Sequence, residues 1–381
     1  MGPPSDVTTR PPIFAVLTGG GTAGHVIPAL ALAELLIEDG IEREALHYLG
    51  TQRGVESQLL PSIGVAATYV RVAGLVRGWS LTALWRNLFV LIGVVRARQA
   101  AIRLFREISP RVVVSVGGYG SVPGCAAAKR LGIPVVTCSY DRRPGLATRR
   151  QSRYAAAVAV AHLPSDLPHA TLTGAPVRAA LRHLDCNATR DGARQRLGLP
   201  AEGMCVVVVG GSLGSRVLNE AVSTMLNLLD HAVSIVHIAG DRYVSELGGE
   251  VAISRSGGNA RYLRMGSTQA MSDVYAAADV IVARAGASTV AEVATVGCAA
   301  VFVPWKDAAE DHQTANARWL ADEGGAVVVQ EDDEVVAQIV TEVSRLVGDD
   351  EARNDLAHRA YACGAVHRHA SHAAVIRSVA R

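Results

Sequence analysis

Short runs of Val, Ile, Leu and Ala alternate along this chain with longer segments in which apolar residues recur at helical spacing. The runs at residues 13–18 and 112–116 are almost wholly apolar, as expected of strands that are buried on both faces of a parallel sheet. Glycine, proline or polar residues follow these runs, where a strand typically gives way to a helix. The pattern therefore predicts an α/β protein with helices on both faces of parallel sheets.

The alternation of strands and helices begins at two places in the chain. A strand, a glycine-rich turn and a helix are expected at residues 13–38 and again at 205–229, which predicts two doubly wound, Rossmann-like domains with a ligand cleft between them, beyond the carboxyl ends of the strands. The expected divisions are a disordered extension at 1–12, an N-terminal acceptor-binding domain at 13–181, a linker at 182–200, a C-terminal nucleotide-sugar-binding domain at 201–350, and helices at 351–381 that pack back across the cleft.

Composition narrows the functional class. A net charge of +2 gives no global field that would attract nucleic acid. The six cysteines lack metal-ligand spacing, so buried free thiols in a reducing cytosol are expected. The first residues lack the apolar stretch of a signal peptide, and no window holds the ~20 apolar residues needed to span a bilayer. We expect a soluble or peripheral membrane protein.

The first candidate site is the motif GGGTAGH at residues 19–25. Glycines there let backbone N–H groups approach an anion at a helix N-terminus. The spacing also matches GxGxxG, but Leu49-Gly50-Thr51 stands where a dinucleotide-binding protein has an acidic residue. A tight turn without a ligand therefore remains an alternative. His25 can act as a general base near neutral pH, or simply hydrogen-bond at the helix start.

Three further motifs lie in the second half. The glycines at 210–215 and the Ser212 hydroxyl can hold a diphosphate, or merely form a tight turn. Glu292, early in a helix after the strand at 280–283, can accept both ribose hydroxyls or simply favour the helix N-terminus. Gln313 and Asn316 share one helix face, which suits sugar hydroxyls and equally a solvated helix start.

Taken together, these motifs resemble those of the MurG family. The shared segments are GGGTAGH, GGYGSVPG at 117–124, GAPVR at 174–178, GGSLGS, RAGASTVAE and DHQTANA. The resemblance implies a GT-B fold and transfer of N-acetylglucosamine from its UDP-sugar to an undecaprenyl-diphosphate-linked muramyl pentapeptide. It also implies inversion at the anomeric carbon without a metal or another cofactor, and no Asp-x-Asp metal motif follows any expected strand.

The resemblance also assigns roles to the matching residues. His25 is the candidate base for the acceptor hydroxyl. The donor side comprises Arg178, Ser212, Gly214, Ser215, Glu292, His312, Gln313 and Asn316. The acceptor side comprises Gly21, Thr22, Gly24, Gly117, Gly118, Tyr119 and Ser121. Because charge develops on the departing diphosphate, N–H groups and Arg178 can stabilise it without Mg²⁺.

The expected partners are the UDP-sugar, a lipid-linked acceptor and an anionic membrane surface, with no nucleic acid. An apolar and basic face against lipid is predicted from Arg77, Trp79, Leu81, Leu84, Trp85, Arg86, Leu88 and Phe89. Packing of several of these residues in the core is the alternative. The expected location is the cytoplasm, peripheral on the inner face of the membrane.

One segment departs from the family pattern. Where the family has His-Glu-x-Asn before Pro-Gly, this chain has Cys138-Ser139-Tyr140-Asp141, followed by Arg142 and Arg143. We expect Asp141, Arg142 and Arg143 on the acceptor side, where the arginines can pair with a carboxylate or phosphate. Two functions follow: the peptidoglycan reaction, or a related reaction of phosphoglycolipid or other natural-product assembly with a changed sugar or acceptor. A nonenzymatic UDP-sugar-binding protein and a UDP-sugar 2-epimerase are the other classes.

Overall fold

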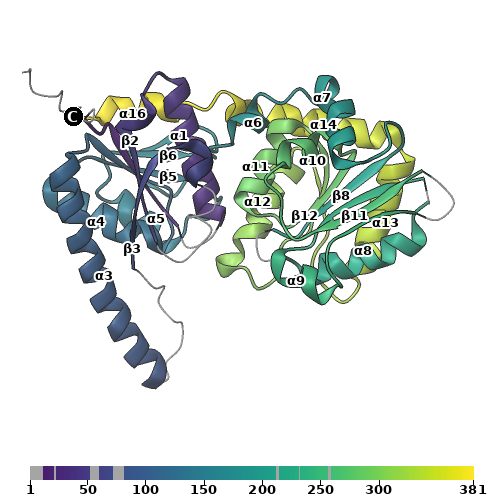
Figure 1. The fold of residues 1–381 in the computed structure, drawn as a ribbon, viewed down its shortest axis with the longest axis horizontal. Helices are drawn as coiled ribbons and strands as arrows, with labels where there is room; N and C mark the ends of the chain where they lie inside the picture. Colours follow the sequence, from purple (N-terminus) through teal and green to yellow (C-terminus); the bar gives the residue numbers. More distant parts are fainter. Residues whose placement is uncertain are drawn as a thin grey trace, which may run out of the picture. The chain divides into compact units, whose positions relative to one another are not determined.

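The computed structural model describes residues 12–20, 23–51, 60–71, 81–211, 214–230, 232–255 and 259–381. The chain forms two compact units. The N-terminal unit comprises residues up to 139, 144–176 and 371–381, and the C-terminal unit comprises residues 140–143 and 177–370. Each unit contains a seven-stranded sheet covered by helices (Figure 1), which confirms the predicted fold of two parallel-sheet α/β domains.

The sheet of the N-terminal unit is parallel throughout and has the order β3-β2-β1-β4-β5-β6-β7. Its strands are β1 (Ala15–Thr18), β2 (Leu46–Thr51), β3 (Ala66–Val70), β4 (Val112–Ser115), β5 (Val135–Ser139), β6 (Ala157–Val160) and β7 (Ala170–Leu172). Its α-helices are α1 (Ala23–Glu38), α3 (Leu81–Ile108), α4 (Val122–Leu131), α5 (Leu146–Ser152) and α16 (His372–Val379). The central strands β1 and β4 are completely buried, as their apolar sequences predict.

The last helix, α16, packs beside α1 in the N-terminal unit (Figure 1). Ile376 is fully buried, and the ring Nε2 of His372 lies 3.1 Å from the hydroxyl of Thr173. The Arg377 guanidinium forms an ion pair with Asp39. The expected block of helices at 351–381 is therefore divided, because residues up to 370 remain with the C-terminal unit.

The sheet of the C-terminal unit has the order β10-β11-β9-β8-β12-β13-β14 and is parallel except for the β10–β11 pair. Its strands are β8 (Cys205–Val209), β9 (Ser234–Ile238), β10 (Val251–Ser254), β11 (Arg261–Met265), β12 (Val280–Ala283), β13 (Ala299–Phe302) and β14 (Val327–Val328). Its α-helices are α6 (Ala179–Arg182), α7 (Cys186–Leu197), α8 (Arg216–Leu228), α9 (Asp241–Glu246), α10 (Met271–Ala277), α11 (Ala287–Val296), α12 (His312–Ala321), α13 (Val335–Gly348), α14 (Asp350–Cys363) and α15 (Ala365–Arg368). Helices α8 and α13 share one apolar core with the strands.

The segment at 182–200 is not the linker that its polar sequence suggested. Most of it is α7, which packs against α10 within the C-terminal unit. Asp279 fastens this helix to the sheet, since its carboxylate accepts hydrogen bonds from Arg190 at 2.6 and 2.7 Å and from the backbone N–H of Cys205 at 2.8 Å. The chain passes from the N-terminal to the C-terminal unit earlier, after Pro176.

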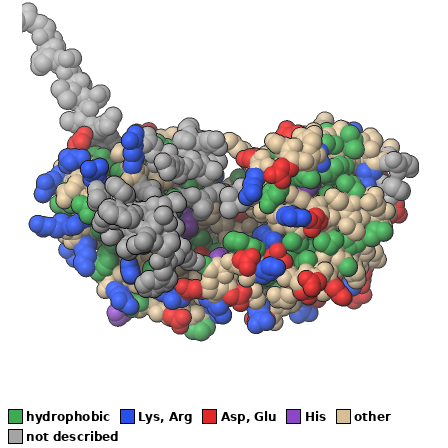
Figure 2. Space-filling view, turned by 90° about the horizontal axis from the view of Figure 1, so that it is seen from below, with side chains coloured by type: hydrophobic (Ala, Val, Ile, Leu, Met, Phe, Trp, Pro, Cys, Tyr) green, Lys and Arg blue, Asp and Glu red, His purple; other side chains and the backbone are tan. Residues whose placement is uncertain are grey.

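Several expectations fall outside the part of the chain that the structure describes. Residues 1–11 of the N-terminal extension, Arg77, Trp79 and the side chains of Leu81, Leu84, Trp85, Arg86, Leu88 and Phe89 are among them. Within the described residues, no helix is both long and apolar enough to cross a membrane. The six cysteines are free, as expected, and four of them are buried. On the visible face of the C-terminal unit, basic and acidic side chains are interspersed (Figure 2).

Candidate active site

The first glycine motif forms the turn between β1 and α1, and His25 lies in the first turn of α1. A methyl group on Gly19 would lie 2.2 Å from Cγ2 of Val116, so only glycine fits where this turn passes the end of β4. Gly20 has a φ of 125°, in the range that favours glycine. Gly24 is exposed, whereas Gly21 and Thr22 lie outside the described residues.

The second glycine motif follows β4 and meets the first. Gly117 and Gly118 have φ angles of 83° and 73°. A methyl group on Gly118 would lie 3.1 Å from ring carbons Cγ and Cδ2 of His25 and 2.9 Å from the carbonyl oxygen of Gly20. The imidazole therefore lies directly against the second glycine turn. Tyr119, the next residue, is exposed at the surface. The structure thus brings His25 together with the turn that contains Gly117, Gly118 and Tyr119, three of the residues expected on the acceptor side.

Ser121 differs from the expectation that it borders the acceptor. It is fully buried, and its hydroxyl donates to the carbonyl oxygen of Gly118 at 2.9 Å and accepts from Nε2 of Gln151 at 2.8 Å. Gln151 in turn accepts from the hydroxyl of Ser115 at 2.7 Å. Ser121 thus supports the glycine turn from inside the unit. The sequence motifs did not point to Gln151, which lies in α5.

Replacement of Gly118 by alanine should disrupt this turn. The added methyl group meets the Gly20 carbonyl and the His25 ring, and the left-handed backbone costs on the order of 1–3 kcal/mol for a residue with a side chain. We expect transfer activity to be lost, as measured by UDP release. Gly132 is the matched control, because its φ is also 73° but a methyl group there meets nothing within 4 Å. Equal losses in both variants would contradict the proposed contact with His25.

The glycine turn of the C-terminal unit lies between β8 and α8. A methyl group on Gly214 would lie 2.4 Å from the carbonyl oxygen of Ala239 and 2.6 Å from Cδ2 of Tyr243, so the turn is tightly packed against the start of α9. Ser215 is buried and caps α8, since its Oγ accepts from the N–H of Leu218 at 3.4 Å. This hydroxyl, expected near the donor diphosphate, is engaged as a helix cap. Ser212 lies outside the described residues.

Glu292 projects from α11 beside a tyrosine and an arginine. Its Oε2 accepts the hydroxyl hydrogen of Tyr275 at 2.9 Å. Burial raises the pKa of the Glu292 carboxyl to about 7, although the hydrogen bond from Tyr275 and the charge of Arg178 both act to lower it. Arg178, at the start of α6, thus lies within electrostatic range of Glu292. The carboxyl is consequently divided between its neutral and ionised forms near neutral pH.

The start of α12 holds two of the residues expected to contact the sugar. Oε1 of Gln313 accepts from the backbone N–H of Trp305 at 3.0 Å, which leaves its NH₂ group to donate elsewhere. The Nδ1–H of His312 donates to the carbonyl oxygen of Ala309 at 2.7 Å, so Nε2 is an acceptor when the ring is neutral. Both side chains are half-buried.

The side-chain amide of Asn316, the third residue expected at the sugar, is hydrogen-bonded within the protein. Its side chain is 1% exposed. Its Nδ2 group donates to Oδ1 of Asp141 at 3.1 Å and to the carbonyl oxygen of Ala285 at 3.3 Å, and its Oδ1 accepts from the N–H of Arg142 at 2.9 Å. Asn316 is therefore a positioning residue. Asp141 and Arg142, expected on the acceptor side, belong to the C-terminal unit and hydrogen-bond to the helix that carries Gln313.

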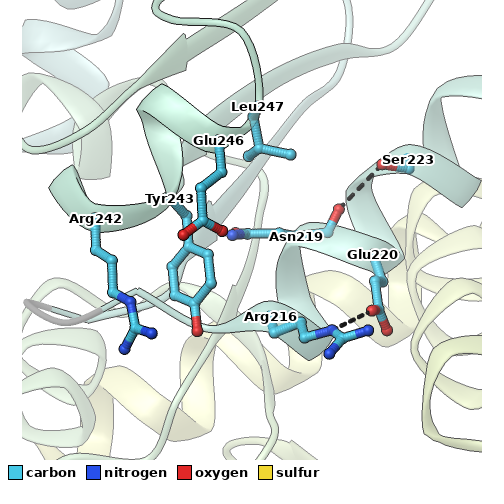
Figure 3. Close-up of a pocket in the computed structure, with 8 residues that line it drawn as sticks. All are labelled: Arg216, Asn219, Glu220, Ser223, Arg242, Tyr243, Glu246 and Leu247. Atoms are coloured by element: carbon cyan, nitrogen blue, oxygen red, sulfur yellow. Dashed lines mark hydrogen bonds and ion pairs between the residues drawn. The ribbon is translucent and has the colours of Figure 1, made fainter.

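A pocket of about 430 Å³ lies between α8 and α9, next to the glycine turn (Figure 3). Arg216 and Arg242 face it together with Glu220 and Glu246, so its charges balance. Asn219 forms part of its wall and accepts from Nε2 of His237 at 2.9 Å. Burial lowers the pKa of His237 to about 4, so this buried network is neutral and supports the turn. No sequence motif pointed to it.

Within the described residues, no group of three or more His, Cys, Asp or Glu side chains is arranged to hold a metal ion. The candidate functional residues thus form two sets, one in each unit. His25 and the glycine turns form the first set in the N-terminal unit. Arg178, Glu292, Gln313 and the glycine turn before α8 form the second set in the C-terminal unit. Both sets lie at carboxyl ends of parallel strands, where open α/β sheets bind ligands.

Comparison with known proteins identifies the family. Residues 15–160 match the glycosyltransferase family 28 N-terminal domain, and residues 205–375 match the family 28 C-terminal domain. The chain is 37% identical over 363 residues to the UDP-N-acetylglucosamine–N-acetylmuramyl-(pentapeptide) pyrophosphoryl-undecaprenol N-acetylglucosamine transferase of Acidothermus cellulolyticus, covering 92% of this chain and 94% of that protein. The chain belongs to glycosyltransferase family 28.

Solved structures agree with this assignment. The crystal structure of MurG from Acinetobacter baumannii matches this family 28 chain with a TM-score of 0.64 and 29% identity, covering 96% of this chain and 98% of that one. The glycosyltransferase of kitacinnamycin matches with a TM-score of 0.64 at 17% identity, covering 98% and 100% of the two chains, a likeness of fold alone. The GT-B fold and the glycosyltransferase class expected from the MurG resemblance are thus confirmed.

Proposed function

We propose that this family 28 enzyme transfers N-acetylglucosamine from UDP-N-acetylglucosamine to a lipid-diphosphate-linked acceptor, with inversion and without a metal or another cofactor. The contact of His25 with the glycine turn at Gly117 and Gly118 is the structural observation that carries the proposal. It places a titratable base beside backbone N–H groups suited to an anion. Support also comes from the relative in Acidothermus cellulolyticus, whose name describes this reaction.

In the proposed reaction, His25 takes the proton of the acceptor hydroxyl. The hydroxyl oxygen forms the new bond to the anomeric carbon as the bond from that carbon to the UDP oxygen breaks. Negative charge appears on the departing diphosphate, where Arg178 and the N–H groups before α8 stabilise it. Glu292 accepts the ribose hydroxyls, and the free NH₂ group of Gln313 donates to the sugar.

We place the reaction in the cytoplasm at the inner face of the membrane, because the acceptor carries a lipid. The peripheral, anionic membrane surface is part of this proposal, and no role in nucleic-acid binding is proposed. On the visible face of the N-terminal unit several basic side chains gather (Figure 2). Such side chains are attracted to anionic lipid, each by about 1 kcal/mol near the surface.

The experiment is a donor and acceptor panel. UDP release is measured with UDP-GlcNAc, UDP-GalNAc, UDP-glucose and UDP-uronic acids, each with and without the undecaprenyl-diphosphate-linked muramyl pentapeptide. We expect UDP release only when UDP-GlcNAc and the lipid acceptor are both present, with an inverted linkage in the product. UDP release without an acceptor, or no transfer from UDP-GlcNAc, would contradict the proposal.

A second candidate is the related reaction with a changed sugar or acceptor, as in phosphoglycolipid or other natural-product assembly. The hydrogen bonds of Asn316 to Asp141 and Arg142 favour this alternative. They engage the side-chain amide that the family resemblance expects to contact the sugar. Preference for another donor in the panel, or for another lipid-linked acceptor, would establish this alternative.

The ionisation of Glu292 gives a pH prediction for donor binding. The ionised carboxylate accepts hydrogen bonds from two ribose hydroxyls, whereas the neutral acid turns one oxygen into a donor and accepts more weakly. The pKa of about 7 leaves mostly the neutral form at pH 6. The affinity for UDP-GlcNAc should therefore rise about tenfold between pH 6 and pH 8. Calorimetry in the absence of acceptor measures this. The Glu292→Gln variant should bind more weakly with a flat profile, and an unchanged pH dependence in that variant would show that another group titrates.

A further inference from the structure

A second pocket, of about 210 Å³, lies where the segment at 140–143 meets α12. All of its lining belongs to the C-terminal unit. Three arginines, Arg142, Arg143 and Arg318, line it together with Asp311 and Asp322. We call it the arginine pocket. It has a net charge of +1 from three arginines and two aspartates, and it lies on the helix that carries Gln313.

The segment that supplies two of these arginines is fastened to α12. The backbone N–H of Arg142 donates to Oδ1 of Asn316 at 2.9 Å, and Oδ1 of Asp141 accepts from the same amide at 3.1 Å. Because Asn316 is 1% exposed and also donates to Ala285, the amide is fixed from three sides. The position of Arg142 relative to α12 is therefore set before any ligand binds, which reduces the entropic cost of binding.

Arg143 is held by a second contact. Its guanidinium donates to the carbonyl oxygen of Glu310, just before α12. Glu310 and Asp311 both have left-handed backbone, with φ angles of 56° and 52°, a conformation that costs non-glycine residues on the order of 1–3 kcal/mol each. Such a strained backbone persists only where neighbouring contacts stabilise it. The hydrogen bond from Arg143 to Glu310 is one of these contacts.

The guanidinium groups of Arg143 and Arg318 retain donors for a ligand. Among the described residues, no ion pair within 4 Å joins Arg143 or Arg318 to Asp311 or Asp322. Arginine has five N–H donors in a planar fork that matches a carboxylate or phosphate. Two such forks facing one pocket from the segment and from α12 are suited to a small oxyanion.

We propose that the arginine pocket binds a carboxylate or phosphate group of a substrate, which rests on the glycosyl transfer proposed above. Such a group has two possible sources. It can be the acidic substituent of a donor sugar, or an anionic group of the lipid-linked acceptor. In either case Arg143 and Arg318 select the substrate that carries the charge.

The test uses the full chain with Arg143→Gln and Arg318→Gln combined, and Arg345→Gln as control, since Arg345 is partly exposed on α13 in the same unit. Dissociation constants are measured by calorimetry for UDP-glucose and UDP-glucuronic acid, which differ by one carboxylate. KM and kcat are measured for the lipid acceptor with UDP-GlcNAc as the donor. Inhibition by inorganic phosphate is measured in parallel. Unfolding temperatures establish that the variants fold.

If the anion comes from the donor, the double variant should raise the dissociation constant for UDP-glucuronic acid at least tenfold and leave that for UDP-glucose unchanged. If it comes from the acceptor, KM for the acceptor should rise at least tenfold, and inorganic phosphate should compete with the acceptor in the unaltered enzyme but not in the double variant. Dissociation constants for both UDP-sugars and a KM for the acceptor that all stay within twofold of the unaltered enzyme would overturn the pocket proposal while leaving the transfer reaction intact. Absence of transfer in the unaltered enzyme would instead reject the proposed function, and calorimetric titration of both proteins with inorganic phosphate would then test the pocket by itself.

Discussion

Replacement of His25 by alanine should lower kcat for sugar transfer by 10²- to 10⁴-fold, the usual contribution of a general base. The ring lies against Gly118 in the N-terminal unit, whereas Glu292 and Gln313 belong to the C-terminal unit. The affinity for UDP-GlcNAc should therefore stay within twofold. Single-turnover kinetics and calorimetric titration with the donor measure the two effects separately.

The control for this variant is His358→Ala, because His358 is an exposed histidine on α14. It should leave both kcat and donor affinity unchanged. A second check is the pH profile of kcat at saturating UDP-GlcNAc, where protonation of Glu292 no longer limits donor binding. This kcat should fall at low pH in the unaltered enzyme as the base is protonated, and the His25→Ala variant should lack that limb. Retention of full turnover in His25→Ala would remove the proposed base from the mechanism.

Replacement of Asp279 by alanine should destabilise the protein by about 2–3 kcal/mol, because it removes a partly buried carboxylate that accepts charged hydrogen bonds. Asp279 accepts two hydrogen bonds from Arg190 and one from the Cys205 N–H. Its Oδ2 also lies 3.5 Å from Nη2 of Arg194, whose side chain is 2% exposed. Without the carboxylate, Arg194 would remain buried beside an unpaired Arg190. Urea denaturation of the full chain measures the change.

Asp273 gives a matched control for this effect. It lies on α10 and also binds α7, through an ion pair with Arg196 at 2.6 Å. The Arg196 side chain is 59% exposed, so Asp273→Ala should cost less than about 1 kcal/mol. Similar losses in the two variants would show that contact between the helices, and not burial of the charge, determines the stability.

The sequence predicts the strands and glycine turns well because their signals are local. Apolar β-branched runs mark β4 and β8, and the glycines at 117–118 are required by their own backbone angles. The helix α7 was not predicted, because its polar sequence resembles that of a linker. Its place in the fold depends on Asp279, which lies 89 residues after its partner Arg190 in the chain.

The sequence motifs do not predict the direction in which their side chains point. Ser121, Ser215 and Asn316 belong to motifs that were expected to contact substrate, yet each is buried. The motifs identify which turns and helices border the site. They do not distinguish a hydroxyl or amide that meets a ligand from one that caps a helix or supports a turn, because that depends on partners such as Gln151 and Asp141 elsewhere in the chain.

The return of α16 to the N-terminal unit bears on how the protein is made. Arg377 and Ile376 complete that unit beside α1, but they leave the ribosome only after nearly the whole C-terminal unit has been synthesised. The N-terminal unit therefore cannot close during translation in the usual domain-by-domain order. A shortened chain that ends at Ala370 would lack part of its first domain, and a fusion partner at the C-terminus would be attached to the first domain instead of the second.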